Sequence, residues 1–141
     1  MKRIIFVCHG NICRSVAAEY IAKRFSDKYE FISRATSYEE SGNYIYPPMK
    51  QALFNAGIPF SHHHATRISN DDYNSADYIF FMDSENEYYL NKMFPNSKKI
   101  FPIYKFTPGI KEIGDPWYDG RFSLVVYQLK ECIRDILANL D

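Results

Sequence analysis

The stretch that decides the fold is Ile4-Ile5-Phe6-Val7-Cys8-His9-Gly10-Asn11-Ile12-Cys13-Arg14-Ser15. Its first half is continuously apolar and partly β-branched, which predicts a buried parallel strand over residues 2–7. Apolar residues then recur at helical spacing, which predicts a helix over residues 15–25 that Ser15 can cap. The loop between them lies at a strand-to-helix joint, where α/β proteins commonly bind anions.

The rest of the chain repeats this alternation. We expect strands at residues 30–35, 78–82 and 98–102, helices at residues 48–56, 83–90 and 122–140, and loops at 36–48, 58–67 and 107–120. Such a pattern predicts an α/β fold: one three-layer domain over residues 1–141, with a four-stranded parallel sheet flanked by helices. Right-handed crossovers leave few strand orders, and we expect the flavodoxin-like order 2-1-3-4. The buried face of the last helix is assigned to Leu124, Tyr127, Leu129, Cys132, Ile133, Ile136 and Leu137.

The composition excludes several classes of protein. Seventeen basic and seventeen acidic residues cancel, so we expect no partner among nucleic acids or membranes. No apolar stretch approaches the roughly 20 residues that span a bilayer, and the N-terminal apolar run is too short for a secretion signal. The three cysteines lack the spacing of a disulfide framework, which favours free thiols and a cytoplasmic location. Without a Cys-x-x-Cys pair we expect no metal and no cofactor.

Cys8 and Arg14 frame a loop suited to bind phosphate. The backbone N–H groups of residues 9–14 can converge on one anion, and the N-terminus of the following helix adds its dipole. The Arg14 guanidinium offers two parallel donors to phosphate oxygens, and Gly10 permits a tight turn. These groups favour the thiolate of Cys8 over the thiol, so a bound phosphate would lie above a nucleophilic sulfur. The spacing alone also suits a small buried cysteine and a surface arginine.

Asp115 is the candidate proton donor for such a reaction. A departing phenoxide or alkoxide needs a proton, and a carboxyl group can supply it. In the segment Gly114-Asp115-Pro116-Trp117-Tyr118, Asp115 follows the last expected strand and so lies at the same sheet edge as Cys8. Trp117 and Tyr118 would offer flat apolar surface to an aryl group. The other interpretation of the segment is a simple Asp-Pro turn.

Together, residues 7–15 and the segment Asp115-Pro116-Trp117-Tyr118 resemble the low-molecular-weight protein tyrosine phosphatases, and the resemblance covers nearly the whole chain. It implies a metal-independent phosphatase that hydrolyses phosphotyrosine and aryl phosphates through a cysteinyl-phosphate. Cys8 would be the nucleophile, Arg14 the phosphate clamp, and Asp115 the general acid and later the base. The residues implied to bind the substrate are His9, Gly10, Asn11, Ile12, Cys13, Arg14, Ser15, Trp117 and Tyr118.

The resemblance also implies supporting roles and partners. Asn11 would hold the loop conformation, Ser15 would stabilise the thiolate, and Cys13 would form a reversible disulfide with Cys8. Arginine-phosphate phosphatases of the superfamily carry threonine where Ile12 stands, so Ile12 favours phosphotyrosine. The partner would be a phosphotyrosine-containing protein, with a tyrosine kinase as one candidate, and phosphate or other oxyanions would bind as product or inhibitor.

Three positions depart from the family pattern or leave an alternative open. Val16 replaces the proline that usually follows Arg-Ser. His9 stands where an apolar or small residue is common, and it would add positive potential beside the thiol. One histidine of the family reaches the phosphate loop, and either His62 or His63 can be its counterpart.

Three other functions remain to be compared with a phosphatase. An arsenate reductase on the same fold needs further cysteines to relay a disulfide, but residues 82–92 contain none and Cys132 lies on an expected buried helix face. A non-catalytic phosphotyrosine-binding module, or a redox sensor that uses Cys8 and Cys13, would not need Asp115. Hydrolysis of an aryl phosphate without added metal distinguishes these functions.

Overall fold

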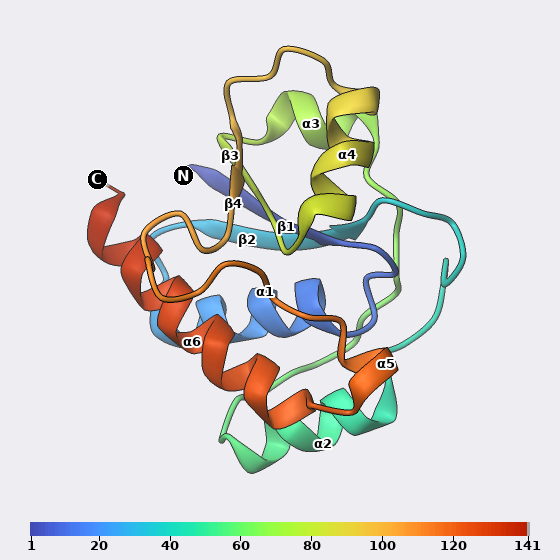
Figure 1. Ribbon diagram of the computed structural model, residues 1–141, viewed down its shortest axis with the longest axis vertical. Helices are drawn as coiled ribbons and strands as arrows, with labels where there is room; N and C mark the ends of the chain where they lie inside the picture. Colours follow the sequence, from blue (N-terminus) through green and yellow to red (C-terminus); the bar gives the residue numbers. More distant parts are fainter. Residues whose placement is uncertain (141) are drawn as a thin grey trace.

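The computed structural model describes residues 1–140 and shows a four-stranded sheet in the middle of three layers (Figure 1). The strands are β1 (Arg3–Cys8), β2 (Glu30–Ala35), β3 (Tyr78–Phe81) and β4 (Ile100–Pro102). All neighbouring strands pair in parallel, and their order is β2-β1-β3-β4. The α/β class and the strand order 2-1-3-4 expected from the sequence are therefore confirmed.

The helices are α1 (Arg14–Phe25), α2 (Pro47–Asn55), α3 (Asn70–Ser75), α4 (Ser84–Met93), α5 (Pro116–Asp119) and α6 (Phe122–Asn139). The sequence pattern predicted four of these to within a few residues but missed α3 and α5. Helix α3 buries none of its residues and is held by a capping box between Ser69 and Asp72, so it has no apolar period to detect. Helix α5 is a single turn that Asp115 caps and Gly120 ends at φ 72°. Within residues 1–140, no helix is long and apolar enough to cross a membrane.

Strand β1 divides the core because its successive side chains point to opposite faces of the sheet. Ile4 and Phe6 belong to the larger cluster, which also contains residues of α1, α2 and α6. Ile5 and Val7 belong to the smaller one, with Leu90 of α4. Figure 1 shows the same division, with α1, α2 and α6 on one side of the sheet and α3 and α4 on the other. Burial on both faces explains why the strand is apolar without alternation.

Helix α6 presents a narrower buried face than its sequence pattern predicted. Leu124 and Tyr127 are exposed, which corrects the assignment of both to that face. The stripe that packs on α1 and α2 follows steps of three and four residues, which place its members on one side of the helix. It consists of Val125, Val126, Leu129, Cys132, Ile133 and Ile136.

The carboxyl ends of the strands gather the polar residues of the site at one edge of the sheet. Cys8 ends β1, and Asp83 follows β3 closely and caps α4. The Ile113 N–H donates to the Met82 carbonyl oxygen at 2.9 Å, which extends the sheet edge and brings Asp115 to it. Segments that are far apart in the sequence therefore meet beside the loop between β1 and α1.

Candidate active site

The loop of residues 8–15, here called the Cys8 loop, turns sharply at Asn11 to connect β1 with α1. Asn11 has φ 61°, in the left-handed region that asparagine tolerates better than most residues. Helix α1 begins at Arg14 without a side-chain cap, so Ser15 is not the cap that the sequence suggested. Its hydroxyl group instead lies 3.0 Å from the Cys8 sulfur.

Three donors converge on the Cys8 sulfur. The backbone N–H groups of Asn11 and Ser15 lie 3.3 Å and 3.4 Å from Sγ, and the Ser15 hydroxyl is the third group. The Asn11 amide donates to Ser15 Oγ at 2.8 Å, so the hydroxyl proton of Ser15 is free to point at the sulfur. Hydrogen bonds directed at a sulfur stabilise its charged form, and the arrangement is therefore suited to a thiolate.

The same Asn11 amide connects the loop to a buried carboxylate. Its second N–H donates to Ser33 Oγ at 3.0 Å, and the Ser33 hydroxyl donates to Glu19 at 2.7 Å. The Asn11 side-chain oxygen accepts from the Thr66 N–H at 3.1 Å. All hydrogen-bonding atoms of this amide are thus used, which holds the loop in one conformation. Sequence reasoning missed Glu19 because it is one glutamate among several in an ordinary helical pattern.

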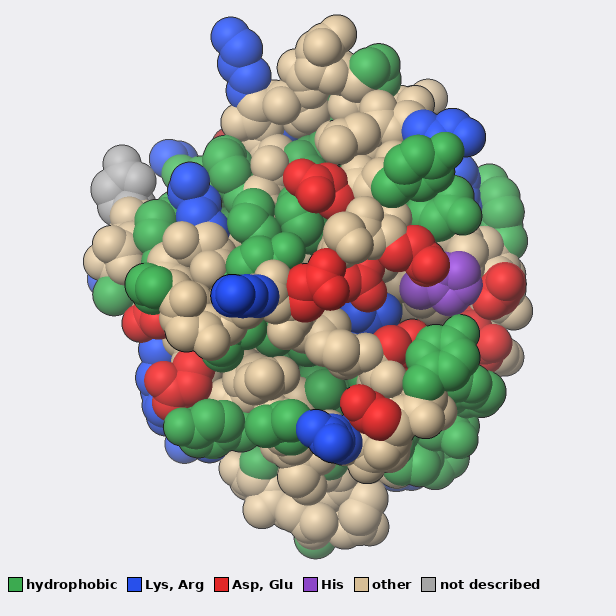
Figure 2. Space-filling view, in the orientation of Figure 1, with side chains coloured by type: hydrophobic (Ala, Val, Ile, Leu, Met, Phe, Trp, Pro, Cys, Tyr) green, Lys and Arg blue, Asp and Glu red, His purple; other side chains and the backbone are tan. Residues whose placement is uncertain are grey.

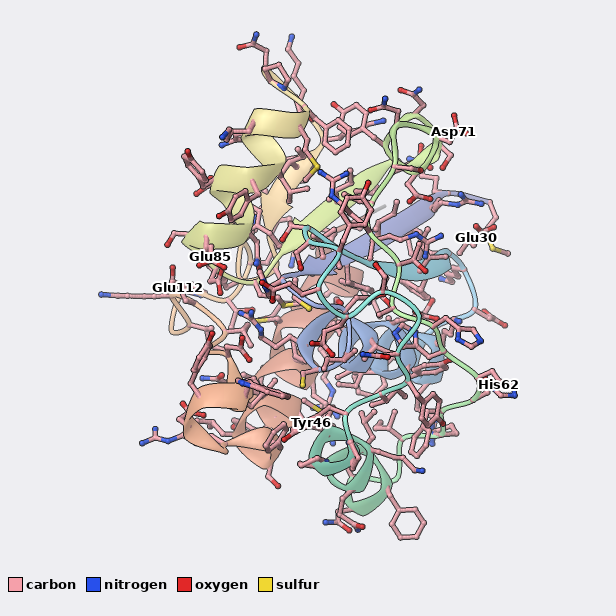
Figure 3. All side chains as sticks on the ribbon, turned by 90° about the vertical axis from the view of Figure 1, so that its right-hand side faces the viewer. Glu30, Tyr46, His62, Asp71, Glu85 and Glu112 are labelled. Atoms are coloured by element: carbon pink, nitrogen blue, oxygen red, sulfur yellow. The ribbon has the colours of Figure 1, made fainter. Side chains whose placement is uncertain are left out.

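His63, rather than His62, supports the loop. Its Nε2–H donates to the Asn11 carbonyl oxygen at 2.6 Å. Burial lowers the pKa of His63, although the hydrogen bond to Asn11 opposes this change. His62 is exposed and projects away from the fold in Figure 3. The alternative left open by the sequence is decided in favour of His63.

Arg14 is a buried cation between two carboxylates. Its side chain is 3% exposed; Nη1 donates to Asp83 at 2.6 Å and to the Ile113 carbonyl at 2.9 Å, while Nη2 lies 3.5 Å from Asp115 Oδ2. Burial acts against the charge, but the Cys8 sulfur and Asp83 outweigh it and raise the pKa of Arg14. The sequence analysis placed Asp83 only at the start of an expected helix, although its position just after β3 puts it at the same edge.

Asp115 has one anchored oxygen and one that faces the site. Oδ1 accepts from the Trp117 N–H at 3.0 Å, which caps α5, and Oδ2 faces Arg14. The side chain is 27% exposed, so water and a ligand can reach it. The structure thus brings Cys8, Arg14 and Asp115 together around one opening.

That opening is a pocket of about 150 Å³ with a buried floor and an open rim. Trp117 and Tyr118 are largely exposed at the rim, and Trp117 packs on Tyr46 with ring centroids 4.6 Å apart. Tyr46 lies at the start of α2 (Figure 3) and was missed because loop tyrosines are frequent in this sequence. The pocket is lined by Cys8, His9, Gly10, Asn11, Ile12, Cys13, Arg14, Glu39, Glu40, Asp115, Trp117 and Tyr118.

The lining includes all but one of the residues expected to bind substrate. The exception is Ser15, which is fully buried and contacts the Cys8 sulfur rather than the open space. Cys13 lines the pocket, and burial together with the nearby Cys8 charge raises the pKa of its thiol. The three cysteines are all free thiols in the structure.

Comparisons with known proteins agree with this geometry. The family model for low molecular weight phosphotyrosine protein phosphatases matches residues 3–141. The human low molecular weight phosphotyrosine protein phosphatase is 35% identical over 152 residues, which cover 96% of this chain and 94% of that protein. The Bacillus subtilis low molecular weight protein-tyrosine-phosphatase YfkJ is 31% identical over 150 residues, covering 99% and 96%.

Among solved structures, the low molecular weight protein tyrosine phosphatase SP-PTP from Streptococcus pyogenes superposes with a TM-score of 0.91 at 34% identity. That match covers 100% of this chain and 94% of the other. With a family model over almost its whole length and relatives above 30% identity, this chain belongs to the low molecular weight phosphotyrosine protein phosphatases.

Proposed function

We propose that this protein hydrolyses phosphotyrosine in other proteins, and aryl phosphates in general, with Cys8 as nucleophile and without a metal. The observation that carries the proposal is the Cys8 sulfur, which faces three hydrogen-bond donors beside Arg14 and Asp115. A thiolate held next to a buried guanidinium can attack a phosphate whose oxygens are bound by that guanidinium.

In the first step, the Cys8 sulfur attacks phosphorus and forms an S–P bond while the P–O bond to the aryl group breaks. The protonated Asp115 carboxyl group gives its proton to the departing phenoxide. Arg14 donates two hydrogen bonds to phosphoryl oxygens. To do so, its guanidinium must give up its contact with Asp115.

In the second step, water attacks phosphorus while the Asp115 carboxylate takes one of its protons. The S–P bond breaks, inorganic phosphate leaves, and Cys8 returns to its thiolate. The donors around Sγ make that thiolate a good leaving group because they stabilise its charge.

The rim favours an aromatic substrate on a protein. Ile12, Trp117 and Tyr118 supply apolar surface around the opening, which suits the ring of phosphotyrosine better than the charged chain of phosphoarginine. A phosphorylated tyrosine kinase is one candidate substrate. A cytoplasmic location fits the chemistry, since a reducing compartment keeps Cys8 as a thiol.

The test is hydrolysis of p-nitrophenyl phosphate and of a phosphotyrosine peptide in the presence of a chelator. We expect activity in the wild type, loss of at least about 10⁴-fold in Cys8→Ser, and near wild-type activity in Cys132→Ser. The control removes a fully buried thiol that lies in α6, outside the pocket. Activity that requires a metal, activity that survives Cys8→Ser, or arsenate reduction in place of hydrolysis contradicts the proposal.

Cys13 is proposed as the redox partner of Cys8. Peroxide would convert the Cys8 thiolate to a sulfenic acid, and attack by the Cys13 sulfur would then form a disulfide and release water. After treatment with peroxide, a thiol reductant should restore the activity of the wild type. The same reductant should restore little activity in the Cys13→Ser variant. Equal recovery of the two proteins contradicts this role.

A further inference from the structure

The His9 side chain lies between two separate elements at the rim of the pocket. Its Nε2 lies 2.8 Å from Glu39 Oε2, in the segment between β2 and α2, and its Nδ1 lies 3.5 Å from Glu85 Oε1 in the first turn of α4. The Ser37 hydroxyl donates to the His9 carbonyl oxygen at 3.0 Å and fixes the backbone on the same side. The ring is therefore held between two carboxylates.

Two carboxylates lie close to the ring, but only one of them is hydrogen-bonded to it. Nε2–H donates to Glu39, whereas Nδ1 makes no hydrogen bond and lies at ion-pair distance from Glu85. A positively charged ring attracts both carboxylates, whereas a neutral ring can only donate to Glu39. The titratable and charged groups around it are Glu39 from the 36–46 segment, Glu85 from α4, Cys8 from β1 and, across the same pocket, Arg14, Glu40 and Asp115.

The rim has an unusual charge for a site that takes a phosphate dianion. Glu39 and Glu40 both line the pocket whose floor holds Arg14. Glu40 is fixed there, because Asn43 donates to its Oε1 at 3.0 Å and its Cγ lies 3.2 Å from where a Cβ on Gly10 would be. Figure 2 shows acidic side chains gathered between α4 and α5 with histidine among them. An incoming phosphate meets these carboxylates before it reaches Arg14.

We propose that His9 is a positioning residue for substrate binding: its imidazolium neutralises Glu39 at the rim and ties the 36–46 segment to α4. The inference rests on the proposed phosphatase function. Without a positive charge at position 9, the Glu39 charge faces the phosphate uncompensated and binding of the dianion weakens. The chemistry at Cys8 stays intact, because the His9 ring makes no hydrogen bond to the sulfur.

The test compares His9→Gln with the wild type, since glutamine can still donate to Glu39 but carries no charge. At low ionic strength we expect the KM for p-nitrophenyl phosphate to rise about three- to tenfold with kcat almost unchanged, as one uncompensated charge at the rim implies. The double variant H9Q/E39Q should recover most of the KM, and the effect should shrink as salt increases.

Equilibrium binding separates this inference from the proposed function. We would measure the affinity of inorganic phosphate by calorimetry for C8S, C8S/H9Q and C8S/H9Q/E39Q, none of which needs turnover. The phosphate affinity should fall in C8S/H9Q relative to C8S and should recover in C8S/H9Q/E39Q. Equal phosphate affinity of C8S and C8S/H9Q, or a loss in kcat that E39Q does not repair, overturns the role of His9. A wild type that binds phosphate with this His9 dependence but hydrolyses nothing contradicts the phosphatase proposal instead.

Discussion

The floor and the rim of the pocket are built in opposite ways. At the floor, Asn11 and Ser15 are fully buried and Arg14 is 2% exposed. Asn11 and Arg14 make hydrogen bonds to other segments, and Ser15 makes hydrogen bonds within the Cys8 loop. At the rim, Trp117 is 53% exposed and Tyr118 is 85% exposed. The floor is therefore fixed by its surroundings before a ligand arrives, whereas the rim is free to adapt to one.

This difference suggests that the floor carries out the reaction and that the rim selects among substrates. Donors aimed at a reacting atom stabilise a transition state best when they need not reorganise, which the buried floor provides. Exposed rings and charges at the rim tune affinity among substrates by small amounts. Changes at the floor should therefore cost far more than changes at the rim, and the following predictions are ways to test that ranking.

Among variants that keep the nucleophile, the largest effect is expected from Asp115→Asn, which keeps the cap of α5 but removes the acidic proton. Turnover of a phosphotyrosine peptide should fall about 10²- to 10⁴-fold. The fall should be smaller for p-nitrophenyl phosphate, since its leaving group needs less protonation. Asp119→Asn is the matched control, because Asp119 is an exposed carboxylate of the same turn and lies outside the pocket. Similar kinetics for D115N and D119N are incompatible with Asp115 as the acid.

The next effect is on stability and concerns Asn11. Asn11→Gly keeps the left-handed backbone but loses the side-chain bonds to Ser15, Ser33 and Thr66. Chemical denaturation should show a loss of about 3 kcal/mol in the free energy of unfolding, from three hydrogen bonds of which two are buried. Asn11→Ala should lose about 1 kcal/mol more, because alanine resists a positive φ. An N11G variant as stable as the wild type would show that the network contributes nothing to the fold.

A smaller effect concerns pH and His63. Burial lowers its pKa in the folded protein, whereas an unfolded histidine titrates at about 6.5. As the pH falls below that value, the unfolded chain binds a proton that the folded chain does not, so the free energy of unfolding decreases.

This contribution is present above the unfolded pKa and is lost as the pH falls through it toward the folded value. His63→Gln should flatten the pH dependence of unfolding by at most about 1.4 kcal/mol per pH unit, the slope for one proton. Urea melts of both proteins between mildly acidic and mildly alkaline pH measure this slope. An identical pH dependence in H63Q rules out His63 as its source.

The smallest effects are expected at the aromatic rim. Trp117→Ala should raise the KM for a phosphotyrosine peptide about two- to tenfold, which corresponds to the binding energy of one aromatic contact. Tyr118→Ala should do less, and it should change the free energy of unfolding by no more than about 0.5 kcal/mol, since its ring is mostly in water. A loss of kcat in either variant as large as that of D115N would remove the distinction between floor and rim.

Sequence reasoning reached the floor more completely than the rim. Strand β1 and helix α1 follow from continuous and helical apolar patterns, and the sheet rule places Cys8 and Asp115 at one edge. The same rule could have placed Asp83 at that edge. The contact between the Ser15 hydroxyl and the Cys8 sulfur was expected, but its support by the Asn11 amide and by Ser33, which lies on another strand, was not.

The contacts of His9 and Tyr46, and the choice between His62 and His63, could not be predicted for a related reason. Each depends on how an irregular segment folds back over the Cys8 loop, and such segments have no periodicity. Helix α3 escaped prediction because a capping box and not an apolar face defines it. Local patterns thus specify the scaffold, whereas the rim is specified by long-range packing.

The central claim is that the reaction passes through a phosphorylated Cys8, and trapping that species tests it most directly. We would mix D115N with p-nitrophenyl phosphate, quench in acid, and locate any added phosphoryl group by mass spectrometry of the digested protein. D115N suits the experiment because loss of the base slows hydrolysis of the S–P bond. The account predicts a phosphoryl group on Cys8 and none in C8S. Hydrolysis by the wild type with no adduct in D115N, or with the adduct on another residue, contradicts it.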